Sequence, residues 1–408
     1  MEISIKEKLI LNKHSFTVGW ACEVLEENDP DFKQFIEDGL VKNVVTRPIG
    51  KGKGCFANIY EIIFINKYDR GYNCVVKIPQ FQKESCENVD ENLKFFKNMD
   101  KTVIMMHNRE CEFYNNFKNI NIKIPKVFSA IPFIPNVQEG ILLMKNLNEC
   151  GAIQCITDSL IPSQMYQIMR YLARLHTYSI INSELFNDKN YSCIFNEMEL
   201  ESWYVPLKFK FKELFGDVIG EVYDEFIEIA IDAKFHHYIM NEAHLENGLC
   251  DVLIHGDVYT HNIFFRKDIF GNTTSELEAI FDWQTMQMGS PVFDVARCIV
   301  MSLDGDIRRR IEEDLLLFYY QKFSDELEKH KIETPFRYEN FRKVYDITFL
   351  QQSGDLLSMI DIFVLRNTEI DKNGKYYKAV LDKVGMKLKH AIEDSVVIIR
   401  KYFSEWKY

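Results

Sequence analysis

The sequence HGDVYTHN at residues 255–262 places a carboxylate, Asp257, five positions before an amide, Asn262. A short apolar run precedes this stretch, and a second apolar run, Leu277–Phe281, ends at another carboxylate, Asp282. In phosphoryl transfer one carboxylate orients the attacking hydroxyl, while an amide and a second carboxylate hold metal against the phosphates. The order and spacing of these three side chains therefore indicate a phosphoryl-transfer site.

Each of the three side chains has an expected role. We expect Asp257 to act as catalytic base or to orient the hydroxyl group of a substrate. Asn262 and Asp282 are expected to hold Mg²⁺, which prefers hard oxygen ligands and substrate phosphates. The competing interpretation is a polar loop followed by an apolar strand. The combination of strand, loop, amide and a second strand ending in a carboxylate is more specific than that interpretation requires.

The composition of the chain is that of a folded protein. Hydrophobic residues make up 47% and aromatic residues 13% of the 408 residues, which excludes a disordered chain. A chain of this length is expected to fold as two lobes or domains. The net charge of -12 argues against a general nucleic-acid binder, because such a protein needs a basic surface.

Cysteine spacing and hydropathy indicate the compartment. The ten cysteines form no CxxC pair, which argues against a zinc ribbon or a thioredoxin-like motif. Scattered thiols in a chain of this length are typical of a reduced cytosolic protein. The charged N-terminus lacks the apolar core of a signal peptide, and no apolar run reaches membrane-spanning length. We therefore predict a cytoplasmic protein that binds neither membrane nor nucleic acid.

The first part of the chain mixes helical and strand patterns. A helical pattern is also present between residues 88 and 118. The other expected elements are helices Trp20–Glu26 and Asp31–Asp38, and strands Asn58–Ile65, Tyr72–Ile78, Ile124–Phe133 and Gly140–Met144.

After residue 147 the pattern turns mainly helical. Ser163 is expected to cap a helix that ends at Tyr178, and residues 206–245 are expected to form one or two long helices. The sequence thus predicts an α+β fold with a β-rich N-terminal lobe, 1–147, and a larger helical C-terminal lobe, 148–408.

Three glycines at alternate positions, Gly50, Gly52 and Gly54, precede the expected strand at Asn58. Glycine permits unusual backbone angles and close approach to phosphates. No Ser or Thr follows a Gly-Lys pair, so this is not a Walker A loop, and a dinucleotide-binding turn would follow a strand rather than precede one. A hairpin turn remains, either the glycine-rich loop of a kinase or an ordinary flexible hairpin.

Lys77 lies inside an apolar strand pattern, where a lysine is costly to bury unless it is paired. In a kinase such a lysine binds the α- and β-phosphates and pairs with a carboxylate from the following helix. The expected helix offers Glu110 and Glu112, and we expect Glu110 to be the partner. The alternative is an edge-strand lysine with two solvated glutamates.

Several further polar residues have either a structural or a functional interpretation. Asp294 either stabilises the loop at residues 255–262 by hydrogen bonds or is an N-cap or first-turn residue of a helix. His176 is expected to be a structural core histidine. His236, His237 and His244 are expected on a solvated helix face rather than in a zinc site.

In their order along the chain, these residues resemble the choline kinase and aminoglycoside phosphotransferase superfamily. The similarity is greatest to its CHK-like branch, which includes ecdysteroid kinase-like proteins and uncharacterised nematode members. The resemblance covers roughly residues 45–400. It rests on Gly50–Gly54, Lys77, Glu110, Leu172 to His176, His255 to Asn262, Phe281-Asp282-Trp283 and Asp294.

The resemblance implies a protein-kinase-like bilobal fold that binds ATP between a small β-rich lobe and a larger helical lobe. It implies that Asp257 is the catalytic base, that Asn262 and Asp282 bind Mg²⁺, and that Lys77 binds phosphate with Glu110 as its partner. The remaining residues that it assigns to ATP are the glycines Gly50, Gly52 and Gly54 and the hinge residues Met144, Lys145 and Asn146.

Asp282 is followed by Trp-Gln rather than the Phe-Gly of protein kinases, and no Ala-Pro-Glu segment or long activation loop follows before Asp294. The expected function is therefore ATP-dependent phosphorylation of a hydroxyl on a small metabolite, such as a steroid alcohol, a glycoside or a choline-like compound. A pseudokinase that binds nucleotide without turnover is the alternative. A metallophosphoesterase would need further metal-binding motifs that the chain lacks.

The sequence leaves the oligomeric state open. It also leaves open whether four aromatic residues line a substrate pocket or, as we expect, the core: Trp203, Tyr204, Phe209 and Phe211.

Overall fold

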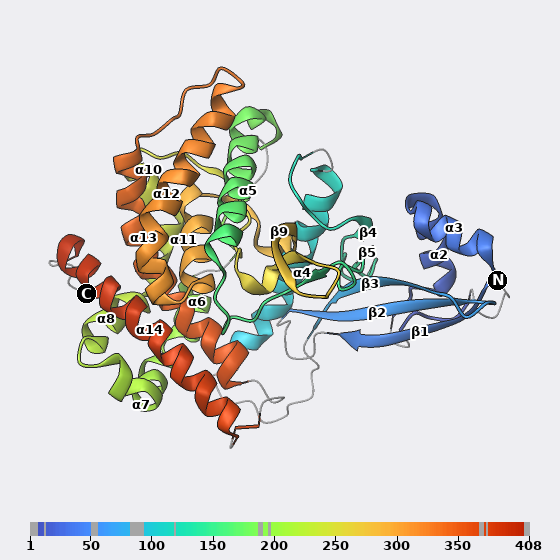
Figure 1. Cartoon of the computed structure of the whole chain (residues 1–408), viewed down its shortest axis with the longest axis horizontal. Coiled ribbons are helices and arrows are strands. Elements are labelled where there is room, and N and C mark those ends of the chain that lie inside the picture. Colours follow the sequence, from blue (N-terminus) through green and yellow to red (C-terminus); the bar gives the residue numbers. More distant parts are fainter. Residues whose placement is uncertain are drawn as a thin grey trace. The chain divides into compact units, whose positions relative to one another are not determined.

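The structure is a computed structural model, and its described residues form two compact units (Figure 1). Unit 1 comprises Met1–Asn119 with Ile124–Cys150, and unit 2 comprises Ile120–Lys123 with Gly151–Tyr408. The residues that the structure describes are 7–11, 14–49, 56–81, 94–117, 120–186, 191–194, 197–366, 371–372 and 374–403.

Two short helices precede the sheet of unit 1, and both were expected from the sequence. Helix α2 spans Val18–Asn28, and the hydroxyl of Thr17 caps it by accepting a hydrogen bond from the Trp20 N–H at 3.1 Å. Helix α3 spans Pro30–Asp38 and begins with proline, whose missing N–H costs nothing at a first helical position.

A five-stranded antiparallel sheet with the order β1-β2-β3-β5-β4 follows these helices. Alternate apolar residues of its strands, such as Ile62 and Phe64, share one buried cluster with α2 and α3. The five strands are β1 (Val41–Ile49), β2 (Ala57–Asn66), β3 (Gly71–Pro79), β4 (Val127–Ile131) and β5 (Ile141–Lys145). Strands β2 to β5 confirm the sequence prediction.

Strand β1 is the strand whose bounds the sequence does not predict, although the expected hairpin turn at Gly50–Gly54 requires a strand before it. It lies at the edge of the sheet and pairs with β2 alone, which permits the proline at position 48. Its register shifts between Val41 and Asn43, so its apolar residues do not alternate regularly. The pattern that identifies a half-buried strand is therefore interrupted.

Helix α4 (Lys94–Asn116) packs on β4 and β3 and confirms the helical pattern expected in this region. A buried stripe recurs along it at helical spacing. Glu110 is the one carboxylate in that stripe, whereas Glu112 lies off it. The stripe consists of Val103, Met106, Glu110 and Phe113, and Phe117 continues it beyond the helix.

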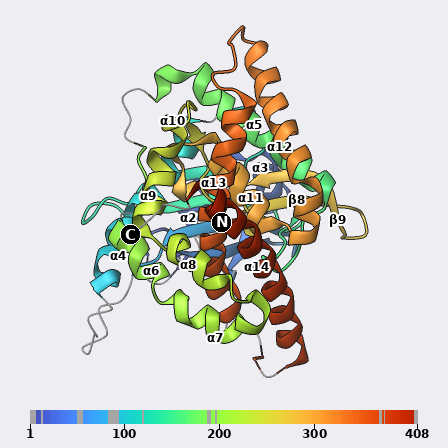
Figure 2. The same ribbon diagram turned by 90° about the vertical axis from the view of Figure 1, so that its left-hand side faces the viewer.

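Unit 2 is mainly helical. Its helices α5, α11, α12 and α13 pack against one another (Figure 1), and α7 and α8 lie against α14 (Figure 2). The helices are α5 (Pro162–Ile181), α6 (Glu197–Tyr204), α7 (Leu207–Ile219), α8 (Tyr223–Ala230), α9 (Ala233–Asn241), α10 (Ala243–Glu246), α11 (Pro291–Ser302), α12 (Gly305–Glu328), α13 (Tyr338–Ile360) and α14 (Lys375–Tyr402).

Two helix predictions for unit 2 are wrong. Helix α5 begins at Pro162, so Ser163 does not cap it, and the Gln164 side chain instead accepts a hydrogen bond from the Ile161 N–H at 3.1 Å. The stretch 206–245, which is described throughout, forms the four helices α7 to α10 rather than one or two. Gly220, with φ of +74°, ends α7, and the Asp232 carboxylate caps α9.

Short strands complete unit 2. Strand β7 (Val252–Ile254) pairs with β10 (Gln287–Gly289), and a three-stranded sheet has the order β6-β8-β9. The strands of that sheet are β6 (Gly151–Ala152), β8 (Ile263–Lys267) and β9 (Thr273–Ile280). The predicted α+β class, with a β-rich part followed by a larger helical part, is confirmed.

In the part of the chain that the structure describes, no helix has the length and apolar character needed to cross a membrane.

Candidate active site

The loop after β7 carries the HGD sequence, and Gly256 determines its path. Gly256 has φ of +82°, in the left-handed region that disfavours side chains. A Cβ atom there would lie 2.5 Å from the carbonyl oxygen of Thr285. The hydroxyl of Thr285 also donates a hydrogen bond to the His255 carbonyl at 3.2 Å. Only glycine therefore fits between His255 and Asp257.

Asp294 stabilises this loop from the first turn of α11. Its buried carboxylate accepts hydrogen bonds from the backbone N–H groups of His255 at 2.7 Å and Gly256 at 2.8 Å. The N-cap of α11 is Ser290, whose hydroxyl accepts a hydrogen bond from the Val292 N–H. The interpretation of Asp294 as the residue that holds the loop is confirmed, and Asp294 is also a first-turn residue of α11, although it is not the N-cap.

His176 is a second buried partner of Asp294. Its Nε2 lies 3.2 Å from the Asp294 carboxylate, and its Nδ1 lies 2.7 Å from the hydroxyl of Tyr319. Burial by itself would raise the pKa of Asp294, but hydrogen bonding and electrostatic interaction with His176 outweigh burial and lower it. His176 is fully buried, so the prediction of a core histidine is confirmed.

His255 connects the loop to the end of β9. Its Nε2 lies 3.0 Å from the Phe281 carbonyl oxygen, and its Nδ1 accepts a hydrogen bond from the Asp257 N–H at 3.2 Å. Burial lowers the pKa of this imidazole, which favours the neutral ring with its proton on Nε2. The sequence does not reveal this link, because Phe281 is distant along the chain.

The β8–β9 hairpin brings Asn262 and Asp282 to the same end. Asn262 directly precedes β8, and its carbonyl oxygen accepts a hydrogen bond from the Phe281 N–H at 3.1 Å. Ile263 pairs with Ile280 in the same antiparallel ladder. Asp282 then turns away with φ of +70°, a conformation that non-glycine residues adopt mainly at functional sites and turns.

Asn262 also holds Asp257. Its Nδ2 donates hydrogen bonds to the backbone carbonyl and to Oδ2 of Asp257, both at 2.9 Å. Because the amide nitrogen faces Asp257, the amide oxygen of Asn262 is the atom that can serve a metal ion. An amide oxygen and the Asp282 carboxylate are hard ligands of the kind that Mg²⁺ takes together with substrate phosphates. The donor chemistry therefore fits the predicted ion.

Arg297 is a site residue that sequence reasoning misses. It lies on α11, and its Nε and Nη2 donate to Oδ1 of Asp257 at 2.8 and 2.6 Å. Its Nη1 donates to Asp355 and to Gln352 on α13, both at 3.1 Å. The available signal is a lone arginine three positions after Asp294 in an otherwise apolar helix.

In unit 1, Lys77 and Glu110 form the expected ion pair. The Nζ of Lys77 lies 2.6 Å from Oε2 of Glu110, and the side chains are only 10% and 1% exposed. Glu112 is half-buried and accepts a hydrogen bond from Asn116. The choice of Glu110 over Glu112 is confirmed, while the role of the pair in binding phosphate stays a prediction.

The expected hinge residues lie at the end of β5. Met144 is buried in the sheet, and the exposed Lys145 lies 3.7 Å from Asp31. The Nδ2 of Asn146 donates to Glu61 at 2.8 Å, so its side chain stabilises unit 1. Their contact with adenine stays a prediction. The expected glycine turn, with Gly50, Gly52 and Gly54, lies outside the described residues.

The prediction of a solvated face for three histidines is wrong for two of them. His236 and His244 are fully buried, and His237 is exposed. The Nε2 of His236 lies 2.8 Å from the Ala230 carbonyl oxygen, and the Nε2 of His244 lies 2.8 Å from the Asp251 carboxylate. Across the described residues no group of three or more His, Cys, Asp or Glu side chains is arranged to hold a metal ion.

The four aromatic residues considered for a pocket differ in burial. Tyr204 and Phe211 are buried, as expected of core residues, and Trp203 is half-buried. Phe209 is 75% exposed, so the core prediction is wrong for it.

A second aromatic cluster consists of Tyr259, His261 and Phe363, of which the first two follow Asp257 closely along the chain. The ring centroids of His261 and Phe363 lie 4.6 Å apart, and those of Tyr259 and His261 lie 5.5 Å apart. Phe363 comes from a π-helical turn, Asp361–Leu365, that follows α13. Such turns are rare and are frequent at functional sites. His261 and Phe363 are half-buried, so their rings are candidate contacts for a substrate, whereas Tyr259 is buried in the core.

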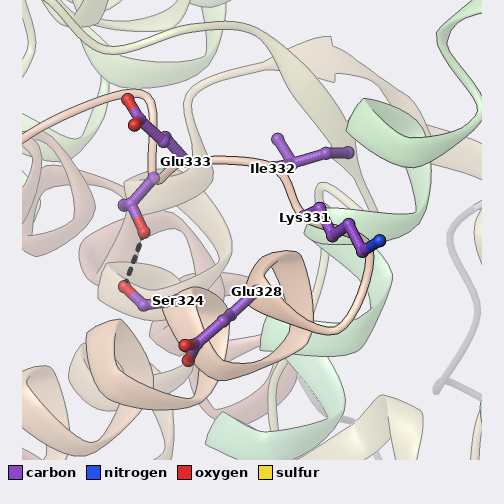
Figure 3. A pocket seen from close by; sticks show the side chains of 6 residues that line it. Ser324, Glu328, Lys331, Ile332 and Glu333 are labelled. Atoms are coloured by element: carbon purple, nitrogen blue, oxygen red, sulfur yellow. Dashed lines mark hydrogen bonds between the residues drawn. The ribbon is translucent and has the colours of Figure 1, made fainter.

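A hollow of about 410 Å³ lies at the end of α12 (Figure 3). Within it the hydroxyl of Thr334 donates a hydrogen bond to that of Ser324 at 2.9 Å. None of its lining residues is one of the predicted site residues. The lining residues are Ser324, Glu328, Lys331, Ile332, Glu333 and Thr334.

The chain is similar to two proteins of Caenorhabditis elegans. The model of the DUF1679 family, described as "Uncharacterized oxidoreductase dhs-27", matches residues 72–402. The protein with that description is 23% identical over 375 residues, which cover 88% of this chain and 44% of that protein. This chain thus spans less than half the length of that relative. "Uncharacterized kinase-like protein D1044.1" is 21% identical over 320 residues, which cover 75% of this chain and 80% of that protein.

Among solved structures, a similar one is a thermostable mutant of the aminoglycoside phosphotransferase APH(4)-Ia in a ternary complex with ADP and hygromycin B. It is 13% identical, the match covers 91% of this chain and 98% of that chain, and the TM-score is 0.37.

Proposed function

The chain belongs to the DUF1679 family, and we propose that it is an ATP-dependent small-molecule kinase that transfers the γ-phosphoryl group of ATP to a hydroxyl group. The main support is the arrangement of Asp257, Asn262 and Asp282 at one end of the β8–β9 hairpin. The description of one relative as kinase-like is consistent with this proposal.

A small-molecule acceptor is favoured over a protein by the short connection after Asp282. The structure describes every residue between Asp282 and the start of α11 at Pro291. This stretch contains only the 3-10 turn Trp283–Thr285 and strand β10. A protein kinase needs a long activation segment at this point to bind its peptide substrate. The connection is too short to contain such a segment.

In the proposed reaction Asp257 accepts a hydrogen bond from the acceptor hydroxyl and orients its oxygen toward the γ-phosphorus. Asn262 holds the carboxylate of Asp257, and Asp294 holds the backbone of the loop. Because these groups are positioned before the substrate binds, little reorganisation is needed during the reaction.

ATP would be bound with Mg²⁺, which when present neutralises negative charge that develops on the phosphate oxygens. The amide oxygen of Asn262 and the carboxylate of Asp282 would hold the ion. Lys77 would bind the α- and β-phosphates, and its ion pair with Glu110 fixes the position of the ammonium group.

The aromatic cluster of Tyr259, His261 and Phe363 supports an acceptor with an apolar body next to its hydroxyl group. Nearby carboxylates are already paired, because Asp355 shares Arg297 with Asp257, and Asp361 pairs with Lys210 and Arg366. A steroid alcohol and a choline-like cation are both acceptors that aromatic rings beside such carboxylates can hold.

The alternative is a nucleotide-binding module without turnover. One observation favours it: both oxygens of Asp257 already accept hydrogen bonds, from Arg297 and Asn262, within the protein. A substrate hydroxyl would have to share an oxygen of Asp257 with one of these donors.

A metabolite screen separates the two functions. Wild-type protein, Asp282→Ala and Asp268→Ala are incubated with γ-labelled ATP, Mg²⁺ and a library of hydroxylated metabolites, and products are identified by mass spectrometry. Asp268 is a matched control, because it is exposed in the turn at the other end of the same hairpin. We expect a labelled product from wild type and Asp268→Ala, and a loss of about 100-fold or more in Asp282→Ala. Thermal stabilisation by Mg-ATP without product across the library would favour the module.

A further inference from the structure

We propose that Arg297 is a positioning residue that occupies Oδ1 of Asp257 and so leaves Oδ2 for the hydroxyl group of the substrate. This inference rests on the proposed function. It identifies the atom of Asp257 that meets the acceptor and the residue that fixes this choice.

The hydrogen bonds of Asp257 distinguish its two oxygens. Arg297 occupies Oδ1, because Nε at 2.8 Å and Nη2 at 2.6 Å both donate to this oxygen from one planar fork. Oδ2 accepts one hydrogen bond, from Asn262 at 2.9 Å, and a carboxylate oxygen has two acceptor positions. Among the described residues Oδ2 is therefore the oxygen with room for a further donor, and the side chain of Asp257 is 15% exposed.

Arg297 is itself held from the other side. Its Nη1 donates to Oδ2 of Asp355 and to Gln352, and Asp355 also accepts hydrogen bonds from Gln351 and from the hydroxyl of Tyr204. All of these groups are buried in unit 2. A buried network whose members are all paired is rigid, so it fixes the rotation of the Asp257 carboxylate.

The charges in this network keep Arg297 protonated. Burial opposes the charge of the guanidinium, but the carboxylates of Asp257 and Asp355 outweigh burial and raise the pKa of Arg297. Asp257 meets the hydroxyl as a hydrogen-bond acceptor that orients it, which suits a loose transition state in which the proton leaves late.

Lysine at position 297 tests the geometry while keeping the charge. A lysine cannot direct two fixed donors at Oδ1 and also reach Asp355, because it lacks the planar fork of arginine. The matched control is Arg308→Lys, at another buried arginine of unit 2 that pairs with Glu312 and Asp394. We expect Arg297→Lys to lower kcat about 100-fold with KM for ATP little changed, and Arg308→Lys to retain kcat.

The split between kcat and KM for ATP provides a readout that a merely structural role would not move, because a rotated Asp257 carboxylate lowers kcat while ATP still binds.

The outcomes separate this inference from the proposed function. Wild type without labelled product contradicts the proposed function and any role of Arg297 in turnover. Active wild type with Arg297→Lys as active as Arg308→Lys overturns the positioning role alone. Crystal structures decide the geometry without turnover: we expect Asp257 to keep its orientation in Arg308→Lys and to rotate in Arg297→Lys. An unchanged Asp257 in Arg297→Lys would overturn the inference.

Discussion

At the scale of single residues, Glu110 and Glu112 show how burial selects one of two similar side chains. Both lie on α4, but only Glu110 belongs to the buried stripe of that helix and meets Lys77. Sequence reasoning can reach this choice, because the stripe follows helical spacing.

We predict that Glu110→Gln lowers the free energy of unfolding by about 3 kcal/mol, because it removes the carboxylate that pairs with the buried ammonium of Lys77. The same change should raise KM for ATP. Glu112→Gln is the matched control and should stay within about 0.5 kcal/mol of wild type. Urea unfolding and ATP titration of both variants provide the measurement, and equal effects of the two changes would contradict the assignment.

His107 predicts a dependence of stability on pH. Its Nε2 lies 3.0 Å from the Ile131 carbonyl oxygen, and burial lowers its pKa from 6.5 to about 4. Because the folded pKa lies below the unfolded one, this stabilisation is complete above pH 6.5 and is lost as pH falls through 4.

The size of this effect follows from the shift. We predict that His107 contributes a loss of about 3 kcal/mol in unfolding free energy as pH falls across this window. His107→Gln cannot titrate, so its unfolding free energy should fall less steeply with acidification. Denaturant unfolding at several pH values measures both slopes, and identical slopes would refute the prediction.

At the scale of elements, the HGD loop depends on a glycine that no other residue can replace. Gly256 and Gly271 both have positive φ, +82° and +84°, but only Gly256 faces a close backbone atom, the Thr285 carbonyl oxygen. We predict that Gly271→Ala costs about 1 kcal/mol from backbone strain. Gly256→Ala adds a clash to the strain, so it should cost more and abolish turnover.

Denaturant unfolding and the phosphoryl-transfer assay test this pair of glycines. An active Gly256→Ala variant as stable as Gly271→Ala would show that the loop tolerates a side chain. That result would remove the physical reason for glycine before Asp257.

The elements that were missed share a physical cause. Strand β1 has an interrupted pattern, so local sequence does not identify it. Arg297 meets Asp257 and Asp355, which lie 40 and 58 positions away along the chain. Periodicity reports which side of an element is buried, but not which distant partner a buried polar group will find.

At the scale of the whole molecule, the order of a β-rich part and a helical part was predictable from hydrophobic patterns. The number of helices in residues 206–245 was not predictable from these patterns, because it depends on local breaks at Gly220 and Asp232. The proximity of Asn262 and Asp282 was predictable, since both lie next to neighbouring apolar strands that pair as the β8–β9 hairpin, while the roles of Asp257, Asn262 and Asp282 stay predictions.

Ligand binding should stabilise the whole chain. A ligand that binds only the folded state adds about 2.7 kcal/mol at one hundred times its Kd. We predict that Mg-ATP raises the Tm of wild type, and that removing Mg²⁺ with EDTA, or Asp282→Ala, reduces the rise. Thermal unfolding monitored by fluorescence measures it, and equal shifts with and without Mg²⁺ would contradict a metal role for Asp282.

The most direct test of the central claim is phosphorus NMR of ATP, Mg²⁺ and a metabolite extract, with wild-type protein or Asp257→Asn. For wild type, we predict that the γ-phosphorus signal of ATP decreases as signals of ADP and a new phosphate monoester appear. Asp257→Asn should show no such conversion over the same time. Release of inorganic phosphate alone, no change in ATP, or equal conversion by both proteins would contradict phosphoryl transfer to a hydroxyl group oriented by Asp257.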